Sequence, residues 1–236
     1  METPQRFLTK ISQRLFSEYG NNLSDLIIVF PSRRASVFFT EELTKFISKP
    51  IWLPKFYSIE DLIFEISELY PPNTLELFFT FYKIYKNNIK TPHSIDKCYK
   101  WAPTLLEDFN DIDKACVNPV KLFNHLSDIK RIESWNLDLN KEMGYAQDYL
   151  LFFSQLDVLY KKLTAELLSK KTAYSGLAQR KLAENPDLFQ KWLNNNNHKK
   201  IIFIGLDALS TCQEKIIDYL LKQNLCSIYW DTDQYF

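Results

Sequence analysis

The chain has 236 residues, of which 46% are hydrophobic, and this is enough to bury one large core or two small ones. Lys and Arg number 29 together, as do Asp and Glu, so the formal net charge of zero excludes a protein that is basic overall and leaves only local patches for nucleic acid. The four cysteines and three histidines are scattered without a CxxC pair, which argues against a zinc site and against a disulfide framework.

The apolar runs of the sequence are short. None approaches the roughly 18 residues of a membrane span, and the N-terminal residues are polar and amphipathic, without the apolar segment of a signal peptide. Because scattered free cysteines also fit a reducing compartment, we expect a cytoplasmic protein with no membrane partner.

The first part of the chain alternates between helical and strand patterns. Apolar residues at a 3.6-residue period predict a helix over 4–19, and the aliphatic run 26–30 predicts a buried strand. A second helix is expected over about 33–48. The segment 51–54 is bounded by prolines and has strand composition, so it predicts a short strand.

The middle of the chain has a helical texture. Ser58 is expected to cap a helix, because Asp61 lies three residues on and a hydrophobic run starts at once. Helical spacing then continues to about residue 192 without a convincing strand, and the many aromatic residues of this stretch are interpreted as core. The predicted helices cover 58–70, 74–87, 94–113, 119–130, 141–170 and 174–193.

The α/β pattern returns at the end of the chain, with a strand over 201–205, a helix over 210–221 and a strand over 226–230. Continuous aliphatic strands alternating with helices predict a parallel sheet covered on both faces. We therefore expect an α/β core formed by 1–57 and 199–236, interrupted by a helical insertion over 58–198. Because the sequence stops just after a strand, we expect it to be the N-terminal part of a longer protein.

Four phrases carry a resemblance that spans nearly the whole chain: VFPSRRASVFF, KPIWLPKFYSIEDL, WAPTLLEDFNDIDK and FIGLDALSTCQEK. With the order of the predicted elements, they resemble the first RecA-like domain of superfamily 1 helicases of the UvrD/RecB type. The closer similarity is to the N-terminal helicase-like part of AddB/RexB-type proteins, Bacteroidetes type. The resemblance implies a RecA-like (P-loop NTPase-like) parallel sheet with helices on both faces, interrupted by a large all-helical insertion similar to helicase domain 1B.

The same resemblance implies a biological setting. AddB-type proteins act in double-strand-break repair and recombination, so the expected partners are single-stranded or broken duplex DNA and an AddA-like helicase/nuclease subunit. A PD-(D/E)XK nuclease domain is expected in the full-length protein. Within this chain no Asp followed by a [DE]-x-Lys pair lies on a credible strand, so the nuclease centre is expected outside it.

The nucleotide-binding motifs of active helicases are missing. Such helicases bind the triphosphate through GxxxxGK[ST], and no GKS or GKT occurs in this sequence. Gly205 and Leu206 stand where the resemblance places the metal-binding Asp and the water-orienting Glu, while Asp207 is shifted by two positions. Asp231 and Gln234 match the segment that couples the γ-phosphate to the DNA strand, and we interpret them as a relic. We expect no catalytic residue, no cofactor and no ATP turnover.

Ser32, Arg33 and Arg34 occupy the position of helicase motif Ia, whose polar residues contact the backbone of the single strand. A guanidinium group donates two parallel hydrogen bonds to phosphate, and the N-terminus of a helix adds amide donors aimed at the same anion. The alternative is that both arginines are solvated, or pair with Glu41, Glu42 or an acidic neighbour in the insertion. The sequence leaves both interpretations open.

The next segment stands where helicases carry T-x-H-S-F, another DNA-contacting motif. Tyr57 replaces the His, and Ser58 is kept. The resemblance makes both candidates for nucleic-acid binding, but a Ser at this position would cap the following helix whether or not a ligand binds.

An acidic cluster in the predicted insertion comprises Glu107, Asp108, Asp111 and Asp113. Its members are interpreted first as solvated carboxylates on a helix surface. The alternatives are a metal site or a contact with a basic face of another subunit. No metal site is predicted.

The sequence leaves two functional hypotheses open. The first is a catalytically inactive helicase-like module that acts as a scaffold and contacts DNA in a helicase–nuclease. The second is a protein–protein interaction module that joins a nuclease domain to a partner ATPase without touching DNA, which the zero net charge and the acidic cluster favour.

Overall fold

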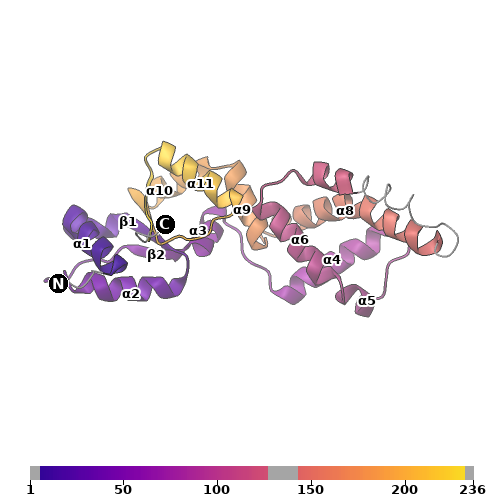
Figure 1. Ribbon diagram of the computed structural model, residues 1–236, viewed down its shortest axis with the longest axis horizontal. Helices are drawn as coiled ribbons and strands as arrows, with labels where there is room; N and C mark the ends of the chain where they lie inside the picture. Colours follow the sequence, from indigo (N-terminus) through magenta and orange to yellow (C-terminus); the bar gives the residue numbers. More distant parts are fainter. Residues whose placement is uncertain (1–5, 127–142, 232–236) are drawn as a thin grey trace. The chain divides into compact units, whose positions relative to one another are not determined.

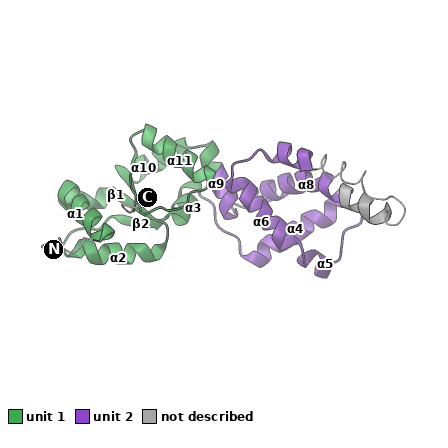
Figure 2. Ribbon diagram, in the orientation of Figure 1, with its two compact units in different colours: residues 1–68, 181–236 green, residues 69–180 purple. Residues whose placement is uncertain are grey.

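The computed structural model describes residues 6–126 and 143–231 (Figure 1). The chain divides into two compact units, which we call unit 1 (residues 1–68 and 181–236) and unit 2 (residues 69–180), as Figure 2 shows. From the sequence, the corresponding boundaries were expected at 57/58 and 198/199. The difference arises because α3 (Ile59–Ser67) contacts the sheet and α10 (Asp187–Asn195) contacts α3, so both helices belong to unit 1.

Unit 1 is built on a four-stranded parallel sheet in the order β2-β1-β3-β4. Its strands are β1 (Leu26–Phe30), β2 (Lys55–Ser58), β3 (Lys200–Ile204) and β4 (Cys226–Tyr229). Every residue of β1 is buried, as expected for the central strand of a sheet covered on both faces. The predicted α/β class with a parallel sheet flanked by helices is therefore confirmed.

The two faces of the sheet are covered by different helices. Ile202 and Ile204 join a buried cluster with residues of α1 (Phe7–Tyr19) and α2 (Arg33–Thr44). Phe203, between them, lies instead beside residues of α3, α10 and α11 (Thr211–Lys222). This alternation is the two-residue period of a strand that is buried on both sides. A short 3-10 helix, η1 (Gly20–Asp25), leads from α1 into β1.

The second strand differs from its prediction. Residues 51–54, all of them described, form no strand, and the sheet gains β2 at Lys55–Ser58 instead. Pro54 has no amide hydrogen to donate to a neighbouring strand, so pairing begins after it. Phe56 then packs its ring against those of Phe30 and Phe39, at centroid distances of 6.2 and 6.1 Å.

Several predicted helices are shorter in the structure or divided. The helix expected over 33–48 ends at Thr44, and the one expected over 94–113 divides into α5 (Ile95–Tyr99) and α6 (Ala102–Lys114). Pro103 lies in the first turn of α6, where a missing amide hydrogen is tolerated. The helix expected over 174–193 divides before Pro186 in the same way, into α9 (Ser175–Glu184) and α10.

In the described part of unit 2 the regular elements are all helices, joined by loops, and one isolated parallel bridge pairs Tyr70 with Thr172. Its other helices are α4 (Thr74–Asn88), residues 119–126 and α8 (Met143–Ser169). The predicted positions 127–130, 141 and 142 lie outside the described residues. Phe109, Phe123 and Tyr160 are buried in mutual ring contact, which confirms that these aromatics form core.

Candidate nucleic-acid interface

The Arg-Arg pair lies at the carboxyl end of a buried strand. β1 ends at Phe30, Ser32 adopts the extended conformation of a helix cap, and α2 begins at Arg33. In the parallel register Phe30 is opposite Ser58, the last residue of β2. The structure therefore brings the predicted sites around Arg33 and Ser58 to the same edge of the sheet, which is where open α/β folds bind ligands.

Arg33 is held by a carboxylate from the neighbouring strand–helix turn. Its Nε and Nη2 donate to the two carboxylate oxygens of Asp61 at 2.7 and 2.5 Å. The hydroxyl of Ser58 donates to the same carboxylate at 2.7 Å, and the amide of Asp61 donates to Ser58 Oγ at 3.1 Å. Hydrogen bonding from Arg33 lowers the pKa of Asp61 to about 2. For both predicted residues the structure thus shows the interpretation that needs no ligand: Arg33 pairs with an acidic neighbour, and Ser58 caps α3.

A pocket of about 370 Å³ lies over this ion pair, lined by Arg33, Ser36, Phe56, Tyr57, Ser58 and Asp61. The cation in it is mostly exposed, since 82% of the Arg33 side chain is accessible to solvent against 30% for Asp61. The pocket therefore offers an anion a neutral ion pair rather than a bare positive charge.

Arg34 has a different environment. It is exposed, and within the described parts of the chain it has no ion pair. Val37 and Phe38, three and four residues on and therefore on the same helix surface, are 58% and 53% exposed. Ser32 is also exposed, and its side chain makes no capping hydrogen bond to the described residues of α2. The Arg34 cation and the first amides of α2 are together the features at this edge best suited to a phosphate.

Tyr57 is half-buried and takes part in packing. Its ring meets that of Trp192 edge-on at 6.2 Å, and Trp192 stacks on His198 at 6.1 Å. Burial raises the pKa of the Tyr57 hydroxyl above its usual value. The ring therefore has a structural role that does not require a ligand, although it also lines the pocket.

The positions of the degenerate nucleotide site follow β3 and β4. Gly205 has a φ of +64°, which favours glycine, and its amide donates to Tyr229 O at 2.9 Å. Leu206 is buried, whereas Asp207 and Asp231 are exposed; Gln234 lies outside the described residues. Across the described ranges, no group of three or more His, Cys, Asp or Glu residues could hold a metal ion.

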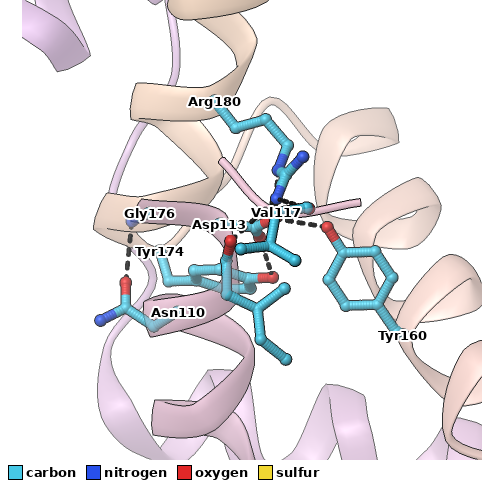
Figure 3. A network of polar contacts seen from close by, with 8 residues as sticks. Asn110, Asp113, Val117, Tyr160, Tyr174, Gly176 and Arg180 are labelled. Atoms are coloured by element: carbon cyan, nitrogen blue, oxygen red, sulfur yellow. Dashed lines mark hydrogen bonds and ion pairs between the residues drawn. The ribbon is translucent and has the colours of Figure 1, made fainter. Parts of the chain in front are cut away.

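The acidic cluster of the sequence separates into two environments. Glu107, Asp108 and Asp111 are exposed on α6, as interpreted from the sequence, whereas the Asp113 side chain is completely buried. Figure 3 shows Asp113 among the side chains of Tyr160, Tyr174 and Arg180, all of which donate hydrogen bonds to its carboxylate. Asp113 is therefore no part of a solvated surface cluster.

Arg180 ties this buried network to the backbone. Its Nε lies 2.5 Å from Asp113 Oδ1, and its Nη2 donates to the carbonyl oxygens of Ile112 and Val117 at 2.9 and 2.7 Å (Figure 3). Burial and the Asp113 carboxylate raise the pKa of Tyr174 well above its usual value, which keeps its hydroxyl protonated as a donor. No local sequence pattern indicates this network, because its partners lie up to 68 residues apart.

No protein-family model and no curated protein matches this chain. Among the described residues, no helix is both long and apolar enough to cross a membrane. The AddB-type family, the repair role and the cytoplasmic location therefore stay predictions.

Proposed function

We propose that this chain is a catalytically inactive, RecA-like helicase module of the AddB type that contacts the backbone of single-stranded DNA in double-strand-break repair. The four-stranded parallel sheet supports it, and so does a helical unit 2 whose residues lie between the two segments of unit 1 in the sequence, as a 1B-like insertion would. A buried Leu206 in place of the expected carboxylate supports the loss of ATP turnover. An AddA-like subunit would supply the motor.

The observation that carries the proposal is the environment of Arg34. It is an exposed cation in the first turn of α2, at the carboxyl edge of the sheet, and no ion pair holds it within the described residues. A phosphate there would accept from the guanidinium and from the amides at the start of the helix. Because the whole chain has no net charge, binding is expected to depend on this local patch.

The test is a salt titration of the binding of a labelled oligothymidylate. Arg34→Ala should weaken binding at low salt and reduce the slope of log K against log salt by about 0.7, the contribution of one phosphate contact to a single strand. Arg33→Ala combined with Arg34→Ala should flatten the slope little further than Arg34→Ala alone, because Asp61 already holds Arg33.

Lys45→Ala is the control for charge, because it removes one positive charge at the other end of α2, where Lys45 pairs with Glu42. At about 1.5 Å per residue it lies about 16 Å from Arg34, beyond the screening length at physiological salt. Absence of binding by the wild-type protein at low salt, or equal effects of Arg34→Ala and Lys45→Ala, would refute the proposed contact.

A second candidate function, an interaction module without DNA contact, is favoured by an apolar groove in unit 2. Leu75, Phe79, Ile95 and Tyr99 are all exposed large hydrophobic residues that line one groove of about 350 Å³. Exposed apolar side chains that cluster in this way are typical of protein-binding surfaces. Copurification with a partner ATPase that Phe79→Ser abolishes, together with no oligothymidylate binding by the wild type, would favour this function over the first.

A further inference from the structure

The two adjacent arginines of the candidate interface are not equivalent. Arg33 donates through two nitrogens to both oxygens of Asp61, at 2.7 and 2.5 Å, although its side chain is 82% exposed. Arg34 has no such partner in the described part of the chain. One of the two cations is therefore neutralised in the free protein.

Asp61 is fixed in place independently of Arg33. It lies in the first turn of α3, where the helix dipole favours a carboxylate. The Ser58 hydroxyl donates to it at 2.7 Å, and its own amide donates to Ser58 Oγ at 3.1 Å. The carboxylate is thus a rigid feature of the pocket wall, and the flexible arginine side chain reaches across to it from α2.

A carboxylate and a phosphate bind a guanidinium group in the same way, through two parallel hydrogen bonds to adjacent nitrogens. The Nε and Nη2 donors that meet Asp61 cannot serve a phosphate at the same time, and the pair as a whole carries no net charge. A phosphate that used this face of Arg33 would first have to displace the carboxylate.

On this geometry, and resting on the proposed function, we propose that Asp61 is a built-in competitor of the DNA backbone: an intramolecular carboxylate that occupies the Arg33 fork and limits its contribution to binding. Arg34 then provides the main phosphate contact of the free protein, and Arg33 contributes little while Asp61 holds it. Because exposed ion pairs are weak, the competition is expected to reduce affinity by no more than about fivefold.

The experiment compares Asp61→Asn with Glu60→Gln in oligothymidylate binding at low salt. Both variants remove one negative charge from the first turn of α3, but Glu60, in the described structure, forms no hydrogen bond or ion pair with Arg33. The amide oxygen of the substituted side chain can still accept from Ser58, so α3 keeps its start; the thermal melting curve checks this. Asp61→Asn should raise affinity by up to about fivefold and clearly more than Glu60→Gln.

A double-mutant cycle identifies the arginine involved. Arg33→Ala should change affinity little in the wild-type background and should cancel the gain in the Asp61→Asn background, while the effect of Arg34→Ala should be similar in both. Coupling of this kind would show that Asp61 acts through Arg33 and not by changing the electrostatic potential of the whole site.

These measurements distinguish a failure of the competitor role from a failure of the proposed function. If the wild type binds through Arg34 but Asp61→Asn gains no more than Glu60→Gln, the competitor role is overturned and the proposed function stands. If Asp61→Asn weakens binding, Asp61 positions Arg33 for phosphate and the competitor role is likewise overturned. If neither the wild type nor Asp61→Asn binds the oligothymidylate, both the proposed function and the competitor role fail.

Discussion

Asp113→Asn should strongly destabilise unit 2. The substitution keeps the size of the side chain but removes the negative charge that faces Arg180, in a place where Asp113 has no solvent exposure and the Arg180 side chain only 11%. Breaking a buried ion pair by neutralising one partner costs about 3–5 kcal/mol, because the other charge stays buried. Arg180 would keep its bonds to the carbonyls of Ile112 and Val117, which places the expected loss near the lower limit, at about 3 kcal/mol.

Hydrogen exchange of backbone amides measures this loss locally, as the free energy of opening in α6 and α8. Asp111→Asn is the control: it removes the same charge from the same helix, where the side chain is 67% exposed and lies 3.6 Å from Lys114. An exposed pair of this kind contributes about 1 kcal/mol at most. If Asp113→Asn costs no more than Asp111→Asn, the buried charge does not stabilise the network and the reasoning is refuted.

Two further substitutions test packing and titration. Gly176→Ala should destabilise unit 2 by about 1–3 kcal/mol, since the new Cβ would lie 2.1 Å from the backbone oxygen of Asn110; unchanged exchange rates in α6 would contradict this. Burial and nearby Lys55 lower the pKa of His198 below 6.5, with Asp25 opposing the effect. As pH falls, His198 takes up a proton in the unfolded state before it does so in the folded state. Its contribution to the free energy of unfolding is therefore fully present above pH 6.5 and is lost as pH falls through the pKa of the folded state. Thermal melts at about pH 5 to 8 should show this loss, and His198→Gln should remove it; an equal pH dependence in both proteins would contradict the assignment.

Local signals were enough to predict many elements of the fold. The aliphatic run of β1 is buried on both faces, and such runs have few alternatives to a central strand. Ser58 carries the side chain that a helix start requires, and it caps α3 as the pattern indicates. The sequence pattern predicts the second strand too early, at 51–54, because the sequence of β2 itself, KFYS, begins with a charged residue and is only partly buried at the edge of the sheet.

Contacts between residues far apart in the chain could not be predicted from the sequence. Asp61 is 28 residues from Arg33, and Arg180 is 67 residues from Asp113, so neither contact follows from helical spacing. Asp113 lies on the apolar face of α6, four residues after Phe109 and seven after Leu106, whereas Asp111 two positions earlier lies on the solvated face. Which side chains meet Asp113 on that face depends on α8 and α9, and therefore on packing rather than on the sequence of α6 itself.

The segment that begins unit 2 pairs with the turn after α8, before the chain leaves the unit at Arg180. Tyr70 donates its amide to Lys171 O at 2.9 Å, and Ala173 donates its amide to Tyr70 O at 3.0 Å, which joins the beginning of unit 2 to the strand-like turn after α8. Backbone pairing at this point offsets the conformational entropy that is lost when the long segment between β2 and β3 is closed. The sheet of unit 1 can therefore form while unit 2 folds as a separate unit. The Asp113 network lies within unit 2, whereas Arg33, Arg34 and Asp61 lie within unit 1, so we expect a local loss of stability in unit 2 to leave the contacts of these three residues intact. Oligothymidylate binding that is unchanged by Asp113→Asn, while exchange in α6 accelerates, is therefore the pattern that this division of the chain requires.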